Sequence, residues 1–127
     1  MSQENMEVAE QVVSHNYAFR LLELGVGVCK KSLYEWRQVE LKERVVIFLF
    51  PTNQLPPAYS NFSAHAFTVA ELGIMLRGFE LPYWNWGTGW QVKQFKDEYF
   101  RAKNEADARA QLLIRVIEQK IINPAEL

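Results

Sequence analysis

Hydrophobic side chains recur at helical spacing most clearly after Asn104. Apolar residues follow one another there every three or four positions and form one broad stripe: Ala106, Ala110, Leu113, Ile114, Ile117 and Ile121. Asn104 stands where a helix cap is expected, with Asp107 three residues on, and Pro124 follows where a helix would end. The spacing therefore predicts a long C-terminal helix that reaches Ile122.

A first helix is predicted between Ser14 and Gly25. Ser14 is a favourable N-cap residue, apolar side chains follow it at helical spacing, and Gly25 stands where a glycine commonly ends a helix. An alternative helix would begin at Glu7 and run straight through Ser14, because the apolar residues between them also fit helical spacing. We favour the cap at Ser14, which leaves residues 1–11 as a flexible leader.

A second helix is predicted to begin at Thr68. Thr68 and Glu71 match the Thr-x-x-Glu capping box, in which each side chain accepts a hydrogen bond from the backbone N–H of the other residue. Phe67 precedes the cap and is placed to pack on Leu72, and Gly78 is placed to end the helix. The sequence thus predicts a helix between Thr68 and Gly78.

Two strands are predicted between these helices. Residues 33–39 are rich in aromatic and branched side chains, residues 40–43 form a polar turn, and the run Arg44–Phe50 is apolar on both faces. A strand without a polar face is normally central in its sheet and covered on both sides, or covered by helices on one side and by a partner on the other.

Prolines, asparagines and serines predict that residues 51–66 form a long loop.

Aromatic alternation on both sides of a glycine-containing turn predicts a second hairpin. Its strands would be Leu81–Trp86 and Trp90–Phe95, joined by residues 87–89, with a further short strand over 98–102. An alternative is one helix from Gln91 to Ile122, because apolar residues in this segment also fit a helical step. The capping residue Asn104 favours the hairpin.

These elements predict a single α+β domain over residues 1–127. Its three helices, the longest C-terminal, would pack on one face of a small antiparallel sheet made of the two hairpins. The 127 residues suit one core, and 49% hydrophobic with 23% charged residues is typical of a globular protein. The longest apolar run, residues 45–50, is too short to span a membrane.

The charge balance narrows the partners that we expect. The chain carries 14 lysines and arginines against 15 acidic residues, whereas dedicated nucleic-acid binders usually carry a basic excess. Basic residues do cluster near both hairpins, and on a shared sheet they could form a weak nucleic-acid contact, although acidic neighbours dilute it. A near-neutral surface fits a protein that pairs with itself as a homodimer, or with another protein.

Candidate chemistry is sparse. The single cysteine, Cys29, and an acidic, polar start without a secretion signal suggest a reducing cytoplasm. His15, His65 and Cys29 lack the short local spacing of metal ligands, and the glycine pairs at 25–27 and 87–89 do not match a phosphate-binding loop. We therefore expect a non-enzymatic protein with no catalytic residue, no metal and no cofactor.

The aromatic side chains between residues 81 and 90 form the strongest candidate site. Tyr83, Trp84, Trp86 and Trp90 could present a surface that stacks a planar ligand such as a nucleobase, or one that binds a partner. The alternative is that these rings cap the core beneath the C-terminal helix. Exposure of the rings to solvent would favour binding.

Four stretches of the sequence resemble a known group of proteins. They are residues 14–26, 32–36, 66–73 and 102–114, and the last stretch, Ala102-Lys-Asn-Glu-Ala-Asp-Ala-Arg-Ala-Gln-Leu-Leu-Ile114, is quite specific. They resemble a family of small proteins of phages, prophages and mobile elements in gut Bacteroides and their relatives. The resemblance implies a bacterial or phage origin, a cytoplasmic setting and one α+β domain, and it transfers no catalytic residue.

The leading hypothesis is a small non-enzymatic binding or accessory protein of a phage or mobile element. It would act through contacts with a second copy of itself or with a host or phage protein. One alternative is a counter-defence protein that sequesters a nucleotide-like molecule on the tryptophans. A second alternative is a weak nucleic-acid-binding protein.

Overall fold

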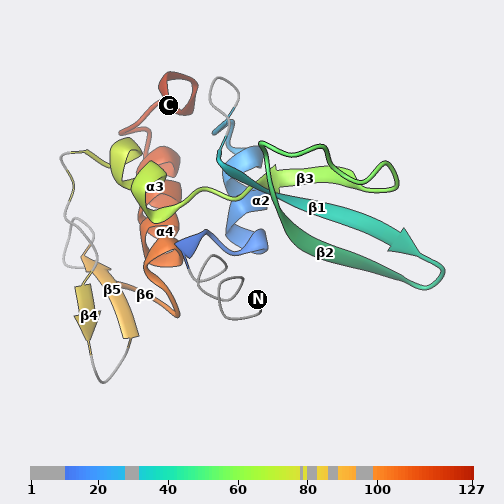
Figure 1. The fold of residues 1–127 in the computed structure, drawn as a ribbon. Coiled ribbons are helices and arrows are strands. Elements are labelled where there is room, and N and C mark those ends of the chain that lie inside the picture. Colours follow the sequence, from blue (N-terminus) through green and yellow to red (C-terminus); the bar gives the residue numbers. More distant parts are fainter. Residues whose placement is uncertain (1–10, 28–31, 78, 80–82, 86–88, 94–98) are drawn as a thin grey trace.

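The computed structural model describes residues 11–27, 32–77, 79, 83–85, 89–93 and 99–127. Its elements are, in chain order, α2 (His15–Glu23), β1 (Tyr34–Leu41), β2 (Arg44–Pro51), β3 (Asn61–His65), α3 (Val69–Met75), β4 (Tyr83–Asn85), β5 (Gly89–Lys93), β6 (Tyr99–Ala102), α4 (Glu105–Glu118) and the 3-10 turn η2 (Pro124–Glu126). The predicted α+β class is confirmed, and α4, near the C-terminus, is the longest described helix (Figure 1).

The predicted cap at Ser14 begins α2. Its backbone is extended (φ −62°, ψ 153°), and Val12 just before it pairs with Thr68 in an isolated bridge. A helix running from Glu7 through Ser14 is therefore wrong. At the other end Gly25 has φ +94°, a left-handed conformation that a glycine adopts without steric cost, and the helix ends there as predicted.

The two later helices begin at their predicted caps and end earlier than predicted. In α3 the Glu71 N–H donates to Thr68 Oγ1 at 3.1 Å and the Thr68 N–H donates to Glu71 Oε1 at 2.8 Å, which confirms the capping box. This helix ends at Met75, ahead of Gly78, which lies outside the described residues. In α4 the Asp107 N–H donates to Asn104 Oδ1 at 2.8 Å.

The end of α4 differs from the prediction for a local reason. The helix stops at Glu118, short of Ile122, and Lys120 takes a left-handed backbone (φ 61°). A non-glycine residue in this region interrupts the helical path. The chain then turns through η2, where Pro124 occupies a first helical position.

The described strands form two antiparallel sheets of three strands each, ordered β2-β1-β3 and β4-β5-β6. The second sheet confirms the aromatic hairpin and its additional strand, so one helix from Gln91 to Ile122 is wrong. The expected single sheet needs correction, because the two hairpins lie in separate sheets with the helices between them (Figure 1). The first sheet contacts α2 through β3, and the second contacts α4 through β5 and β6.

The segment predicted as a loop contains strand β3. Residues 61–65 pair antiparallel with β1, and a register shift between Trp36 and Arg37 marks a β-bulge. Ser63 and Ala64 are both buried, so the alternation of a regular strand is broken. Because of the bulge and of the prolines and asparagines nearby, polar and apolar residues do not alternate regularly here. The strand therefore cannot be recognised from a two-residue pattern in the sequence.

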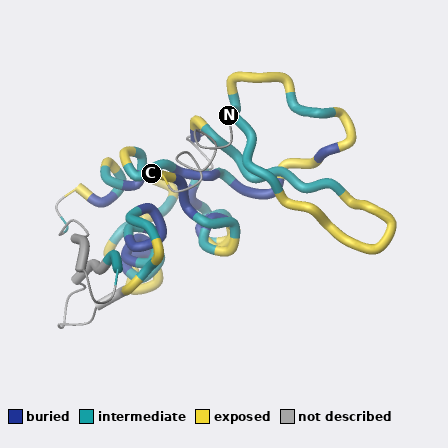
Figure 2. The backbone as a smooth tube through the Cα atoms, turned by 60° about the horizontal axis from the view of Figure 1, so that its bottom comes forward, coloured by how far each residue is buried: buried dark blue, intermediate teal, exposed yellow. Residues whose placement is uncertain are grey.

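The core lies among the helices (Figure 2). Its largest buried side chains include Phe67, Leu21, Leu72, Leu112 and Leu113. Asp107 is also buried, and its carboxylate has a role beyond the capping pair with Asn104 that the sequence indicates. The Ser14 N–H donates to Asp107 Oδ1 at 2.6 Å and the Ser14 hydroxyl donates to Oδ2, so one carboxylate joins the starts of α2 and α4.

Candidate functional site

Strand β2 lies at an edge of its sheet. The strand order is β2-β1-β3, and no described strand pairs with the outer side of β2. Val45, Val46 and Ile47 are 54%, 37% and 38% exposed, which is unusual for consecutive large apolar residues. The prediction that this apolar strand is central and covered on both sides is wrong. The other expectation, that helices cover one side of the strand and a partner the other, stays a prediction.

The backbone of β2 alternates between the two sides of the strand. In an antiparallel pair, residues of every second position bond to the neighbouring strand and the others point away from it. Leu41 pairs with Arg44 across a two-residue turn, and the Thr52 N–H donates to Leu33 O at 3.0 Å at the other end. Both contacts place the even-numbered residues of β2 toward β1.

The odd-numbered residues therefore form the open edge of β2. Val45, Ile47 and Leu49 direct both N–H and C=O away from β1, and Pro51, which has no N–H, ends the row. Proline is tolerated at such a place because its nitrogen faces away from the ladder. The open edge is thus a row of three donor–acceptor residues that ends at a proline.

The side chains of β2 extend apolar surface onto both faces of the sheet. Val46, Phe48 and Phe50 share one face, where the rings of Phe48 and Phe50 meet edge to face at 6.4 Å between centroids. Val45, Ile47 and Leu49 share the other face. The distal half of the hairpin extends away from the helices and is largely exposed (Figures 1 and 2).

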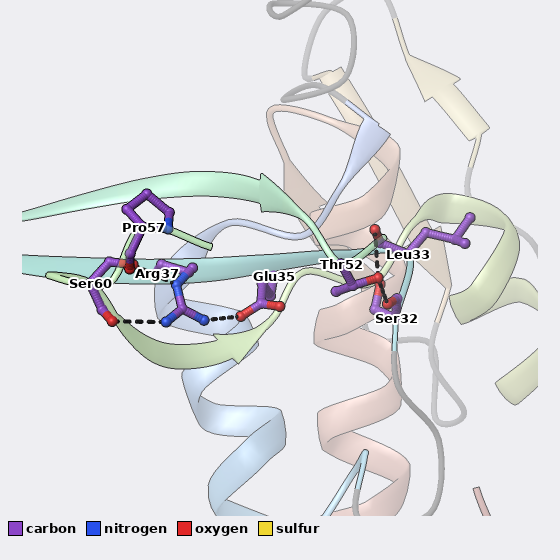
Figure 3. A network of polar contacts seen from close by, with 7 residues as sticks. All are labelled: Ser32, Leu33, Glu35, Arg37, Thr52, Pro57 and Ser60. Atoms are coloured by element: carbon purple, nitrogen blue, oxygen red, sulfur yellow. Dashed lines mark hydrogen bonds and ion pairs between the residues drawn. The ribbon is translucent and has the colours of Figure 1, made fainter. Parts of the chain in front are cut away.

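A network of polar contacts holds the base of the hairpin (Figure 3). Arg37 forms a 2.6 Å ion pair with Glu35, and both side chains are largely buried, at 11% and 15% exposed. The same guanidinium donates to Ser60 Oγ at 2.8 Å and to Ser60 O at 2.9 Å, and Thr52 Oγ1 donates to Ser32 O at 2.9 Å. Charge-assisted bonds of this kind are strong and directional, so they fix the loop between β2 and β3 against β1.

A second anchor connects the sheet to the body. The Trp36 indole N–H donates to Val13 O at 2.9 Å, and the His15 ring lies 6.1 Å from the Trp36 ring. His15 Nε2 also hydrogen-bonds Ser63 Oγ at 2.7 Å. Burial lowers the pKa of His15 below its ordinary value. These contacts hold the sheet that contains β2 against α2.

The tryptophan site is placed only in part. Tyr83 and Trp84 lie in β4, and Trp84 pairs in register with Trp90 of β5, as the predicted hairpin requires. Trp90 is half-buried and packs against the core, and Trp86 lies outside the described residues. The role of Tyr83, Trp84, Trp86 and Trp90 in binding therefore stays a prediction.

The remaining sequence candidates are distributed over the fold. The basic residues of the two hairpins lie on different sheets, so the shared basic face that we considered does not form from the described strands. Within the described ranges, no three His, Cys, Asp or Glu side chains gather where they could hold a metal ion. Cys29 lies outside those ranges. None of the helices that the structure describes is long and apolar enough to cross a membrane.

Sequence reasoning did not select the open edge as the candidate site. The run Val45–Phe50 did indicate a strand that needs cover on both faces, and this was the available signal.

Comparison with protein-family models, with curated proteins and with solved structures finds no match. Function is therefore inferred from the geometry of the chain itself.

Proposed function

We propose that this chain is a small non-enzymatic binding protein that acts through protein–protein contacts made by the open edge of β2. One observation carries the proposal: a mainly apolar strand of eight residues, Arg44–Pro51, lies at the edge of its sheet, has no described strand on its outer side, and exposes the side chains of Val45, Val46 and Ile47. Long apolar edge strands are hazardous for a protein because they recruit other strands, and native proteins usually blunt or cover them. A strand that is left open in this way fits addition of a partner strand.

Binding rather than catalysis is favoured by how the described polar groups are used. Asp107 accepts from Ser14, Glu71 accepts from Thr68 and from Ser32, and Arg37 pairs with Glu35. Each of these groups supports the scaffold. The apolar edge, in contrast, has no partner strand among the described residues.

The setting that we propose is the cytoplasm of a bacterium that carries a phage or mobile element. Support for it comes from the sequence resemblance over residues 14–26, 32–36, 66–73 and 102–114. In this setting the partner is a host protein, a phage protein or a second copy of the chain.

Photo-crosslinking in bacterial cells tests the proposal. The full chain is produced with p-benzoyl-phenylalanine in place of Ile47, or in place of Ile74, which is 54% exposed on α3 and serves as the matched control. We expect position 47 to crosslink to a protein that mass spectrometry identifies, and Val45→Lys to abolish the product, because lysine on an edge strand opposes strand addition. Equal yields at positions 47 and 74 would contradict the proposal.

A second candidate function is sequestration of a nucleotide-like molecule. The register of Trp84 with Trp90 favours it, because two tryptophans paired across a hairpin can offer a stacking surface. The packing of Trp90 against the core opposes it. Titration with a panel of nucleotides should quench tryptophan fluorescence if this function is correct, and a panel without any response would remove it.

A further inference from the structure

We infer that the open edge of β2 pairs with the same edge of a second copy, antiparallel, about a two-fold axis that lies midway between the two Ile47 residues. This inference rests on the proposed function and names its partner. The pairing would join two three-stranded sheets into one continuous sheet ordered β3-β1-β2 and, in the second copy, β2-β1-β3. Such an isologous contact uses one surface patch twice and closes after two copies.

The position of the axis follows from the alternation of the backbone. Only odd-numbered residues of β2 direct their N–H and C=O outward, so an antiparallel ladder must pair odd residues with odd residues. An axis between two residues would pair odd with even and would leave these outward groups without opposite partners. The axis must therefore lie midway between one residue and its own twin in the second copy, and an axis is named below by that residue.

An axis at Ile47 gives every outward backbone group of the open edge a hydrogen-bonding partner. It pairs Val45 with Leu49 of the second copy and Ile47 with its own twin. Every outward N–H and C=O of these three residues then finds a partner, which is the condition for burying backbone groups without loss. Pro51 falls beyond the last paired residue, so its missing N–H costs nothing.

An axis at either neighbouring residue gives a less complete ladder. It either leaves an outward backbone group without a partner or pairs β2 with residues outside the strand. An axis at Phe48 would place Pro51 opposite Val45, and the Val45 carbonyl would lack a donor because proline has no N–H. An axis at Val46 would place Leu49 opposite Glu43, which belongs to the turn before β2. Ile47 is therefore the position at which the ladder is complete.

Charge and side-chain chemistry agree with this register. Arg44 is the only charged residue of β2, and the pairing places it opposite Phe50 of the second copy, far from its own twin. Like charges opposite one another would destabilise a sheet, and none meet across this ladder. Val46 meets Phe48, and Ile47 meets Ile47, so between residues 45 and 49 apolar residues face apolar residues on both sides of the sheet.

The other edge of the sheet is less suited to pairing. β3 has five residues, against eight in β2, and its pairing with β1 contains a bulge. Short length and bulges are devices that blunt an edge strand. The sheet is therefore protected at β3 and open at β2, which directs a second copy to β2.

Light scattering after gel filtration tests the pairing with the full chain. The wild-type protein should elute at twice its 14.8 kDa chain mass at high concentration. Ile47→Lys should raise the dimer dissociation constant more than about tenfold, because it places two like charges opposite one another at the axis. Ile74→Lys, at an exposed isoleucine of α3, should leave the dimer unchanged, and circular dichroism checks that each variant is folded.

Disulfide formation tests the register. In a Cys29→Ser background, Ile47→Cys places two thiols opposite each other at a Cα separation of about 5.5 Å, which a disulfide can bridge. Val45→Cys places its twin roughly 13 Å away along the strand, beyond that reach. We expect crosslinking at position 47 to be at least about tenfold faster than at position 45.

The outcomes separate this inference from the proposed function. A monomer at all concentrations, or equal crosslinking rates at positions 45 and 47, would overturn the self-pairing. If position 47 still captures a different, identified protein in cells, the proposed function stands without the self-pairing. If neither self-pairing nor capture is found, both are wrong.

Discussion

Helix α4 and strand β2 are both rich in large apolar side chains, yet the fold treats them differently. Leu112 and Leu113 of α4 are 1% and 0% exposed, whereas Val45 of β2 is 54% exposed. α4 packs against α2, α3 and the second sheet, while β2 has β1 on one side only. Apolar character therefore does not decide burial by itself. The number of neighbouring elements does, and an apolar segment with too few neighbours is a candidate contact surface.

The largest expected effect is in the helical core. Leu113→Ala should lower the free energy of unfolding by about 3 kcal/mol, because it removes a fully buried side chain and leaves a cavity. Urea unfolding followed by circular dichroism measures the change. Ile121→Ala, at a residue that is 52% exposed, is the control and should cost far less. Equal losses of unfolding free energy in the two variants would contradict the distinction between core and surface.

The buried carboxylate should give the next largest effect. Asp107→Ala leaves the N–H and hydroxyl of Ser14 without their acceptor, and we expect a loss of about 2 kcal/mol in the free energy of unfolding. Ser14→Ala, measured alone and with Asp107→Ala, completes a double-mutant cycle. The two changes should be strongly non-additive because the residues are in direct contact. Simple additivity would show that the contact contributes little.

His15, at the start of α2, connects the helices to the sheet that contains β2, and its titration tests that connection. Burial lowers the pKa of His15, so the unfolded chain binds a proton more readily than the folded chain. The contribution of His15 to stability is therefore fully present above its ordinary pKa of 6.5 and is lost as the pH falls below that value. The unfolding free energy of the wild type should fall more between about pH 7.5 and pH 5.5 than that of His15→Gln. Parallel curves would contradict this.

The smallest expected effect is at the open edge. Val45→Thr keeps the branched shape of an exposed strand residue, so the unfolding free energy of the monomer should change by less than about 0.5 kcal/mol. Measurement at low protein concentration keeps association out of the result. A loss as large as that of Leu113→Ala would mean that β2 belongs to the core, and the contrast between the two regions would disappear.

The parts of the fold that the sequence predicts are specified by near neighbours. Thr68 and Glu71 bond within one helical turn, Asn104 bonds to Asp107, and Gly25 sets its own backbone angle. Such signals depend on residues three or four positions apart, so a sequence pattern contains them completely. The starts of α3 and α4 and the end of α2 follow from them.

The parts that it misses depend on distant pairings. Whether β2 is central or at an edge depends on whether β3 pairs with β1 or with the free side of β2, and the apolar run within β2 does not record that choice. The candidate site follows the same rule: the apolar run Val45–Phe50 is visible in the sequence, but its exposure is not. Ser14 is a partial case, because its place as a cap is local while its side chain bonds to Asp107.

The contact between Ser14 and Asp107 also has a consequence for synthesis on the ribosome. It joins residues 93 positions apart, so α2 cannot meet α4 until nearly all of the described chain has emerged. The β1–β2 hairpin needs only its own short turn and can form much earlier. We therefore expect the contact between α2 and α4 to form only after α4 has emerged, while the β1–β2 hairpin is already present on the nascent polypeptide.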